Sequence, residues 1–417
     1  MSSDDGFVTH LESAIDGTTF EARAEHTVHQ GRPLWVRYDL PAVASALAKH
    51  ALEARSPNMW RYRELLPVPP GRPVISLHES VTPLVECPKL ASRFGLPQVW
   101  IKDESRLPTG SFKARGMAVA VNMAVRFGRR RLAVPSNGNA GGALAAYAAA
   151  AGAEAYVFMP ADTPRGNVEE CVLAGARTFL VDGLIGDCAK IVRQHAEAMD
   201  WFDLSALKEP YRLEGKKTMG LELAEQMNWR LPDWILYPTG GGTGLIGMWK
   251  AFQELAALGW LEDRSLPRMV AVQSDGCAPI PRAFEAAQRF AEPWPDPHTV
   301  ASGLRVPSAI GDFLILDAVR QSGGRALAVE ESRIEEWQSL AAGLTGLGIC
   351  PETGACVGAL DQLIHTGTIR PSDRVVLFNT ASATKYALGV VLDLPRLHPS
   401  ADPADSLRTI RTQAPPR

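Results

Sequence analysis

A lysine lies where the sequence predicts that a strand is followed by a helix. In "IKDESRLPTGSFKARGM" a strand ends near Lys102, residues 108–111 form a turn, and a helix begins near Phe112. Lys113 therefore falls in the first helical turn, where unpaired N–H groups and the helix dipole disfavour a cation. Such a site lowers the pKa of an amine and makes the neutral amine available for Schiff-base chemistry. On this turn alone, a solvated surface lysine is the simpler interpretation.

Two later turns carry groups that bind anions. In "AVPSNGNAGGALAAY" a helix begins after Ser136, Asn137 and Gly138, so its first N–H groups suit a carboxylate, and Asn139 suits a ring or phenolic oxygen. In "WILYPTGGGTGLIG" residues 240–244 form a run of unobstructed N–H groups that can hold one phosphate. A capped Asn/Gly turn is a common structural alternative for the first of these.

The glycines of the second turn also match the G-x-G-x-x-G of a dinucleotide site, at Gly242, Gly244 and Gly247. That site requires an acidic residue at the end of the next strand, about 20 residues on, to bind the ribose. Residues 262–263 are acidic but precede the strand "RMVAVQ", and Asp275 comes too late. A single phosphate therefore fits this loop better than a dinucleotide.

A fourth stretch, "RVVLFNTASATKYALG", ends a strand and then presents the hydroxyl groups of Thr380 and Ser382. In isolation it is typical of a polar turn.

The elements that carry these turns alternate between strands and helices from about residue 98 onwards. We expect strands in "VWIK", "RLAVPS", "AYVFMP", "RTFLVD", "WILYPT", "MVAVQ" and "RVVLFNT", and helices over residues 112–127, 140–151, 187–199, 216–227, 245–258 and 334–342. Near-continuous apolar strands alternating with helices predict a buried parallel sheet covered on both faces. Ligands bind such sheets at the carboxyl ends of the strands, where all four turns lie.

Composition narrows the function classes. The chain has 417 residues, 46% hydrophobic and 21% charged, with a net charge of -3, which gives no electrostatic case for nucleic acid or an anionic membrane as partner. Its six cysteines form no C-x-x-C pair, which disfavours a disulfide framework or a cysteine zinc site. The acidic N-terminus does not read as a signal peptide, and the Ala-rich stretch near residue 145 is interrupted by Gly152 and Glu154. We expect a cytoplasmic protein.

Taken together, "PTGSFKARG", "SNGNAG", "PTGGGTG" and "NTASATKY" resemble the motifs of the tryptophan-synthase-like, fold type II pyridoxal-phosphate enzymes, and most of all the threonine synthase family, over roughly residues 75 to 392. The resemblance implies a two-domain α/β fold in which each domain is an open, mostly parallel sheet flanked by helices. It implies a large cofactor-binding domain over residues 75–117 and 209–393, a small mobile domain over residues 118–208, an N-terminal arm over residues 1–74 and a loose tail over residues 394–417.

The resemblance also implies the roles of particular residues. Lys113 would form the Schiff base with pyridoxal 5'-phosphate, Asn139 would bind the 3'-oxygen, and Thr380 would face the ring nitrogen. The cofactor phosphate would be held by Gly240, Gly241, Gly242, Thr243 and Gly244. The substrate would be bound by Ser111, Ser136, Asn137, Gly138 and Arg212, with Arg212 on a substrate phosphate. Lys208, Lys216 and Lys217 are expected to form a solvated, basic helix start.

The implied reaction converts O-phospho-L-homoserine and water to L-threonine and phosphate. Ala140 and "SALKEPYR" depart from residues of the family that distinguish substrates. A serine/threonine ammonia-lyase, or a β-replacement enzyme using an O-phosphoserine-like substrate, is therefore an alternative. A non-catalytic cofactor-binding scaffold and an NAD-dependent oxidoreductase are more distant ones. The resemblance implies a homodimer.

The arm is similar to a zinc ribbon that has lost its cysteines. Where ligands would stand, the chain has Ser13, Asp16, Val28 and Gln30. His10, His26 and His29 lie nearby, but a thiolate-free zinc site with this spacing would be unusual. We expect no metal.

Overall fold

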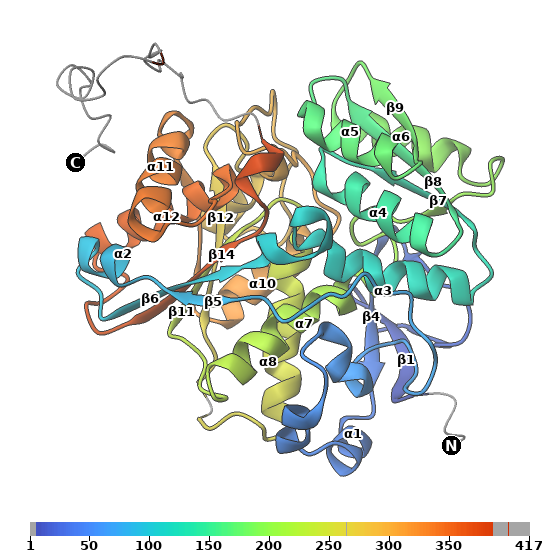
Figure 1. The fold of residues 1–417 in the computed structure, drawn as a ribbon, viewed down its shortest axis with the longest axis horizontal. Helices are drawn as coiled ribbons and strands as arrows, with labels where there is room; N and C mark the ends of the chain where they lie inside the picture. The colour runs from blue at the N-terminus through green and yellow to red at the C-terminus, as the bar shows by residue number, and fades with distance from the viewer. Residues whose placement is uncertain (1–5, 264, 387–398, 400–417) are drawn as a thin grey trace.

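The computed structural model describes residues 6–263, 265–386 and 399, and Figure 1 shows how they are arranged. Three sheets organise the chain: an antiparallel sheet near the N-terminus, a four-stranded parallel sheet and a six-stranded, mostly parallel sheet. The predicted α/β class, with mostly parallel sheets flanked by helices, is confirmed. The predicted tail over residues 394–417 lies outside the described residues, Pro399 excepted.

The six-stranded sheet has the order β13-β12-β11-β14-β6-β5, in which β5 is an antiparallel edge strand. Its strands are β5 (Leu84–Glu86), β6 (Gln98–Asp103), β11 (Trp234–Pro238), β12 (Arg268–Ser274), β13 (Arg325–Val329) and β14 (Arg374–Asn379). The central strands are continuous apolar runs because helices cover both faces, with α12 packed on β11 and β14 and α10 packed on β12. Strands β5 and β13 were not among the predicted strands.

The four-stranded parallel sheet has the order β10-β7-β8-β9 and lies to the upper right of Figure 1 with its helices. Its strands are β7 (Arg131–Pro135), β8 (Glu154–Pro160), β9 (Arg177–Val181) and β10 (Phe202–Asp203). Helices α4 (Asn139–Ala150), α5 (Arg165–Leu173) and α6 (Ile185–His195) pack on it. Helix α3 (Lys113–Arg126) runs unbroken across the predicted domain boundary at residues 117–118. The domain limits themselves stay a prediction.

Helix α7 (Tyr211–Gln226) packs between α3 and α8 (Thr243–Ala257). The prediction of a solvated, basic start to this helix is wrong, because its side chains are buried from Tyr211 through Ala224. A Cβ on Gly215 would lie 2.0 Å from the carbonyl oxygen of Arg115, so α3 and α7 cross at backbone contact. The remaining α-helices are α1 (Leu40–Ala46), α2 (Pro88–Arg93), α9 (Pro279–Glu285), α10 (Asp312–Gln321), α11 (Ile334–Thr345) and α12 (Pro351–His365).

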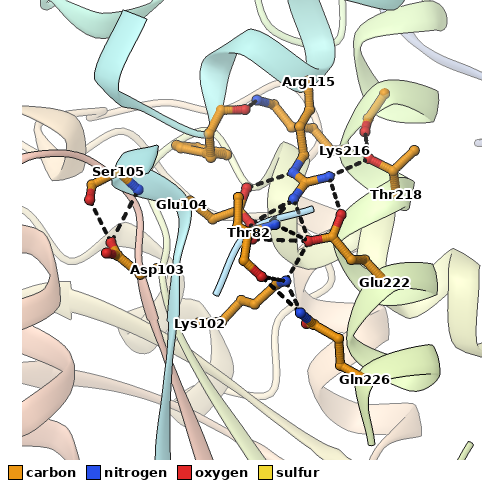
Figure 2. A network of polar contacts seen from close by, with 12 residues as sticks. Thr82, Lys102, Asp103, Glu104, Ser105, Arg115, Lys216, Thr218, Glu222 and Gln226 are labelled. Carbon is orange, nitrogen blue, oxygen red and sulfur yellow. Dashed lines mark hydrogen bonds and ion pairs between the residues drawn. The ribbon is translucent and has the colours of Figure 1, made fainter. Parts of the chain in front are cut away.

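A buried network of charges joins α3 and α7 to the end of β6, as Figure 2 shows. Arg115 donates from Nε to Glu104, 2.6 Å away, and from Nη1 to Glu222, 3.0 Å away. Lys102 also pairs with Glu222, and all four side chains are at most 1% exposed. Burial raises the pKa of the Glu222 carboxyl, but Arg115 and Lys102 outweigh that effect and hold it at about 2. The network therefore fixes α3, whose first residue is Lys113, against the two neighbouring elements.

The N-terminal residues form an antiparallel sheet of order β2-β1-β4-β3. Its strands are β1 (Val8–Ser13), β2 (Thr19–Phe20), β3 (Val28–His29) and β4 (Arg32–Tyr38). Tyr38 donates to Glu214 of α7 over 2.8 Å, which anchors the sheet on the body. Asp16 lies 3.2 Å from the Nε2 atom of His29, but the described residues contain no group of three metal-binding side chains. Within the same residues, no helix is both long and apolar enough to cross a membrane.

Candidate active site

A cavity of about 230 Å³ opens where β7, β11 and β14 end and the following turns begin. The structure brings most of the predicted site residues to its wall, namely Lys113, Ser136, Asn137, Gly138, Asn139, Arg212, Gly240, Gly241, Gly242, Thr243, Gly244 and Thr380. Ser111 does not line it. Its backbone forms a bridge with Ala381, and its side chain is fully buried with no hydrogen-bond partner among the described residues.

Lys113 is the first residue of α3, where the sequence placed it. Its Nζ atom lies 4.2 Å from the centroid of the Phe112 ring. The side chain is half-buried and lines the cavity. Burial, followed by the positive charge of Arg212, lowers the pKa of the Lys113 amine to about 7, although Glu352 acts in the opposite sense. A large fraction of this amine is therefore neutral and nucleophilic at physiological pH.

The turn after β7 is shaped by Ser136. Its Oγ atom accepts hydrogen bonds from the N–H groups of Gly138 and Gly141, at 3.0 and 2.9 Å. Gly138 itself has a φ of +139°, a conformation that side chains rarely adopt. Two of the N–H groups at this turn thus have a partner within the turn, which leaves those of Asn139 and Ala140 for an anion.

The side chains of Asn137 and Asn139 each keep one free acceptor. Asn139 donates from Nδ2 to the hydroxyl oxygen of Tyr386 over 3.0 Å, and Asn137 donates to the carbonyl oxygen of Arg305 over 2.9 Å. The Oδ1 atoms of both asparagines have no partner among the described residues. Buried amide oxygens without a partner are costly, so this wall is suited to a ligand that donates hydrogen bonds.

The glycine loop after β11 packs so closely against its neighbours that two of its positions have no room for a side chain. A Cβ on Gly240 would lie 2.3 Å from the carbonyl oxygen of Gly303, and one on Gly244 would lie 2.0 Å from the hydroxyl oxygen of Tyr237. Gly242 has a φ of +78° and precedes α8, so the loop enters that helix in a left-handed conformation. The glycine loop and the start of α8 both line the cavity, and N–H groups of a glycine loop and of a helix start favour a phosphate.

Thr380 follows β14 and links it to the lysine helix. Its carbonyl oxygen accepts from the N–H of Phe112 over 3.0 Å. Its Oγ1 atom lies 3.7 Å from the Sγ atom of Cys350, and burial raises the pKa of that thiol to about 12, so the neighbour of the hydroxyl is an uncharged thiol. A neutral hydroxyl group at this position does not supply the negative charge that would protonate a ring nitrogen.

Arg212 reaches the cavity from the first turn of α7. Its backbone N–H is held by the carboxylate of Glu209, and one Nη atom donates to the carbonyl oxygen of Leu204. The side chain is 3% exposed, and its Nε atom has no partner among the described residues. Lys208 lines the same wall, whereas Lys217 is buried and paired with Glu214 and Glu254.

Several residues of the cavity wall were not predicted, and Phe112, Tyr237, Glu352 and Tyr386 are among them. Phe112 and Tyr237 are adjacent to predicted motifs and could have been proposed from that adjacency. Glu352, at the start of α12, has no such signal. Its Oε1 atom accepts from the N–H of Gly303 over 2.8 Å, and it places a buried carboxylate in the cavity.

Comparison with known proteins gives the family. Residues 75–381 match the family model described as "Pyridoxal-phosphate dependent enzyme". The chain is 33% identical to the threonine synthase of Methanocaldococcus jannaschii over 361 residues, which is 86% of this chain and 88% of that protein. It is 34% identical to the threonine synthase of Methanosarcina acetivorans over 351 residues, which is 84% of this chain and 85% of that protein.

Solved structures give the same fold. Maize serine racemase aligns with a TM-score of 0.62 at 20% identity, covering 72% of this chain and 88% of that one. Diaminopropionate ammonia lyase from Escherichia coli aligns with a TM-score of 0.63 at 18% identity, covering 74% and 86%. At these identities the likeness concerns the fold alone. The cavity, the family model and the curated relatives agree, and the chain belongs to the threonine synthase family of fold type II, pyridoxal-phosphate-dependent enzymes.

Proposed function

We propose that the protein is a threonine synthase that converts O-phospho-L-homoserine and water to L-threonine and phosphate. The observation that carries the proposal is a buried guanidinium group, that of Arg212, in the same cavity as a lysine whose pKa is about 7. An arginine with unused N–H donors suits a phosphate group on the substrate. The curated relatives are named threonine synthases, which supports the same product, L-threonine.

The cofactor of the family is pyridoxal 5'-phosphate, and the donor set of the cavity fits it. The glycine loop at residues 240–244 lines the cavity and would hold its phosphate through backbone N–H groups, because it carries no side chain except that of Thr243. Asn139 would face the phenolic oxygen, whose O–H can donate to the unpaired Oδ1 atom of that side chain, and Thr380 would offer a hydroxyl group to the ring nitrogen. When bound, the cofactor supplies an aldehyde that exchanges amines and a ring that withdraws electrons.

The residues of the chain perform the remaining tasks. The Lys113 amine would hold the aldehyde of the cofactor, and once free it would take and return protons at the substrate carbons. A pKa near 7 suits both directions of this transfer. The free N–H groups of Asn139 and Ala140 orient the substrate carboxylate. Arg212 binds the phosphate that leaves.

We expect the apoprotein to bind the cofactor aldehyde faster as the pH rises through about 7, because the neutral Lys113 amine is the attacking form and its pKa is about 7. The rate should level off about one pH unit above that value. Stopped-flow absorbance after mixing apoprotein with pyridoxal phosphate measures it, with the exposed Lys190→Ala as control. A midpoint near 10 would mean that an ordinary, solvated lysine reacts.

We expect Gly240→Ala to weaken cofactor binding strongly and Gly241→Ala to weaken it much less. A Cβ at Gly240 would meet the carbonyl oxygen of Gly303 at 2.3 Å, whereas at Gly241 the nearest atom is the Cβ of Ala206 at 3.5 Å. A forced backbone shift at a preorganised site costs about 1–3 kcal/mol, or about 10- to 100-fold in Kd. Titration of each apoprotein with pyridoxal phosphate gives both constants. Equal losses of affinity in the two variants would show that the space around Gly240 does not determine how tightly the loop binds the cofactor.

The second candidate function is a serine or threonine ammonia-lyase. The buried carboxylate of Glu352 favours it, because negative charge in the cavity opposes a substrate that carries a phosphate dianion. The two functions differ in their products. A lyase releases a 2-oxo acid and ammonia, and the synthase releases threonine and phosphate.

The test is a product assay on the holoenzyme. O-Phospho-L-homoserine is supplied, and phosphate, threonine and 2-oxobutanoate are measured together, with L-serine and L-threonine as alternative substrates. The synthase predicts equal amounts of threonine and phosphate, and a KM that rises in Arg212→Lys more than kcat falls. Formation of a 2-oxo acid from L-serine, without turnover of the phosphorylated substrate, would replace the synthase with the lyase.

We also propose that the protein works as a homodimer in the cytoplasm and that the N-terminal arm binds no metal. Size-exclusion chromatography with light scattering tests the dimer. Elemental analysis of the purified protein tests the absence of zinc.

A further inference from the structure

Two lysine amines lie against one aromatic ring beside the cavity. The Nζ atom of Lys113 is 4.2 Å from the centroid of the Phe112 ring, and that of Lys216 is 3.9 Å from it. Lys113 lines the cavity, whereas Lys216 comes from the interior of α7, is fully buried and does not line the cavity. Lys216 is therefore not placed to bind a substrate, and its burial needs another explanation.

Lys216 holds the backbone just before Lys113. Its Nζ atom donates a hydrogen bond to the carbonyl oxygen of Phe112. On the other side, the N–H of Phe112 donates to Thr380, so the peptide groups of this residue are tied both to α7 and to the end of β14. Figure 2 shows Lys216 beside the Arg115 network that fixes the next turn of α3.

The neighbouring helix makes room for this contact. A Cβ at Gly116 would lie 2.9 Å from the Cε atom of Lys216, so the lysine passes over a residue without a side chain. The hydrogen bond thus depends on a glycine in the first turn of α3 and on a side chain of α7 that carries a donor.

The charges around Lys216 determine its protonation state. Lys113 and Arg115 on α3 and Arg212 on its own helix are positive, and Glu104 at the end of β6 is the negative group that faces it. Burial, together with these positive groups, lowers the pKa of the Lys216 amine well below its usual value. An uncharged amine can still donate one hydrogen bond, and it adds no second positive charge beside Lys113.

We propose that Lys216 is a positioning residue for Lys113: its amine holds the carbonyl group of Phe112 and thereby fixes the ring and the first turn of α3, so that Lys113 faces the cavity. This inference rests on the proposed role of Lys113. In this proposal Lys216 neither binds the substrate phosphate nor faces the solvent. The amide of glutamine can donate to the same carbonyl group, whereas the thioether of methionine cannot.

The experiment compares Lys216→Met and Lys216→Gln with the natural sequence, and Lys190→Ala serves as an exposed control. Trace acetylation of the apoprotein across pH 5–11, read by peptide mass spectrometry, gives the apparent pKa of Lys113 without cofactor or substrate. Stopped-flow mixing with pyridoxal phosphate gives the rate of cofactor binding. Far-UV circular dichroism and thermal unfolding establish that each variant is folded.

In Lys216→Met we expect the apparent pKa of Lys113 to rise from about 7 towards its ordinary value, because a mispositioned amine reaches solvent. The rate of cofactor binding should fall by about 10- to 100-fold, the usual cost of misplacing a reacting group by about 1 Å. Lys216→Gln should restore both quantities to within about threefold of the natural protein, since it keeps the donor.

Two results would overturn the proposal. A folded Lys216→Met whose acetylation midpoint and binding rate match the natural protein would show that Lys216 serves packing alone. A folded Lys216→Gln that loses as much as Lys216→Met would show that the hydrogen bond to Phe112 does not position Lys113. Neither outcome is affected by the identity of the substrate. If Lys113 is not the lysine that forms the Schiff base, Lys113→Ala should bind the cofactor normally. That result is separate from the two above.

Discussion

Replacing Lys113 with alanine should reduce kcat/KM for O-phospho-L-homoserine by at least about 10³-fold, because the same amine binds the cofactor and moves the protons. The holoprotein should also lose the visible absorbance of the lysine-bound cofactor. After borohydride reduction, mass spectrometry should find the cofactor on the peptide of Lys113 in the natural protein and on no peptide of the variant. Lys190→Ala is the matched control.

The result that contradicts this prediction is cofactor on another lysine. Among the described residues, Lys208 is the other lysine that lines the cavity. Reduced cofactor on Lys208 in the natural protein would move the reactive amine from the start of α3 to the segment before α7.

Removal of the Lys113 amine has a second consequence, for the stability of the apoprotein. The pKa of Lys113 is about 7 in the folded chain and about 10.4 in an unfolded one, so between these values the unfolded chain binds more protons and stability rises with pH. Lys113→Met, which carries no proton, should therefore unfold at a higher temperature than the natural apoprotein at pH 7. That difference should shrink as the pH is raised to 9. Differential scanning calorimetry at both pH values measures it.

Replacing Arg115 with methionine should lower the free energy of unfolding by about 3–5 kcal/mol, which is the usual loss when one partner of a buried ion pair is removed. The loss is large because Glu104 and Glu222 remain buried, and among the described residues Lys102 is the one cation that still pairs with Glu222. Denaturant unfolding, or the thermal midpoint if unfolding is irreversible, measures it. The exposed pair of Arg165 and Glu169 is the control, and Arg165→Met should cost less than about 1 kcal/mol.

The double variant of Arg115→Met and Glu222→Gln separates a lost interaction from a general loss of packing. Groups in one network show interaction energies of about 0.5–3 kcal/mol, so the double variant should lose less than the two single variants added together. Strict additivity would mean that Arg115 and Glu222 stabilise the fold independently, despite their 3.0 Å separation.

The parts of the site that the sequence predicted are those with a local physical signature. Lys113 at a helix start and the glycines at 240–244 sit where a strand ends and a helix begins, so strand and helix patterns were enough to find them. The sequence separation between these turns did not matter, because parallel strands bring their carboxyl ends to the same edge of the sheet.

The parts that were missed depend on tertiary contacts. Glu352 enters the cavity from the first turn of α12 and Tyr386 from the segment after β14, and neither position has a glycine signal. The charged residues of α7 are typical of a solvated helix, because their buried partners are distant in the sequence. Lys102, which pairs with Glu222 of α7, lies 120 residues earlier. Strand β13, "RALAV", was missed because it is short and begins with an exposed arginine.

The buried network of Figure 2 also bears on how the chain folds during its synthesis. Glu104 and Arg115 leave the ribosome before Glu222, which supplies the second carboxylate of that network. At about 5–20 residues per second, the 107 residues between Arg115 and Glu222 take seconds to emerge. Until then α3 cannot pack against α7. By that time all strands of the β7–β10 sheet have been synthesised, whereas β11–β14 of the six-stranded sheet have not. The nascent chain therefore exposes the lysine helix for that interval, and completion of α7 is the event that closes it.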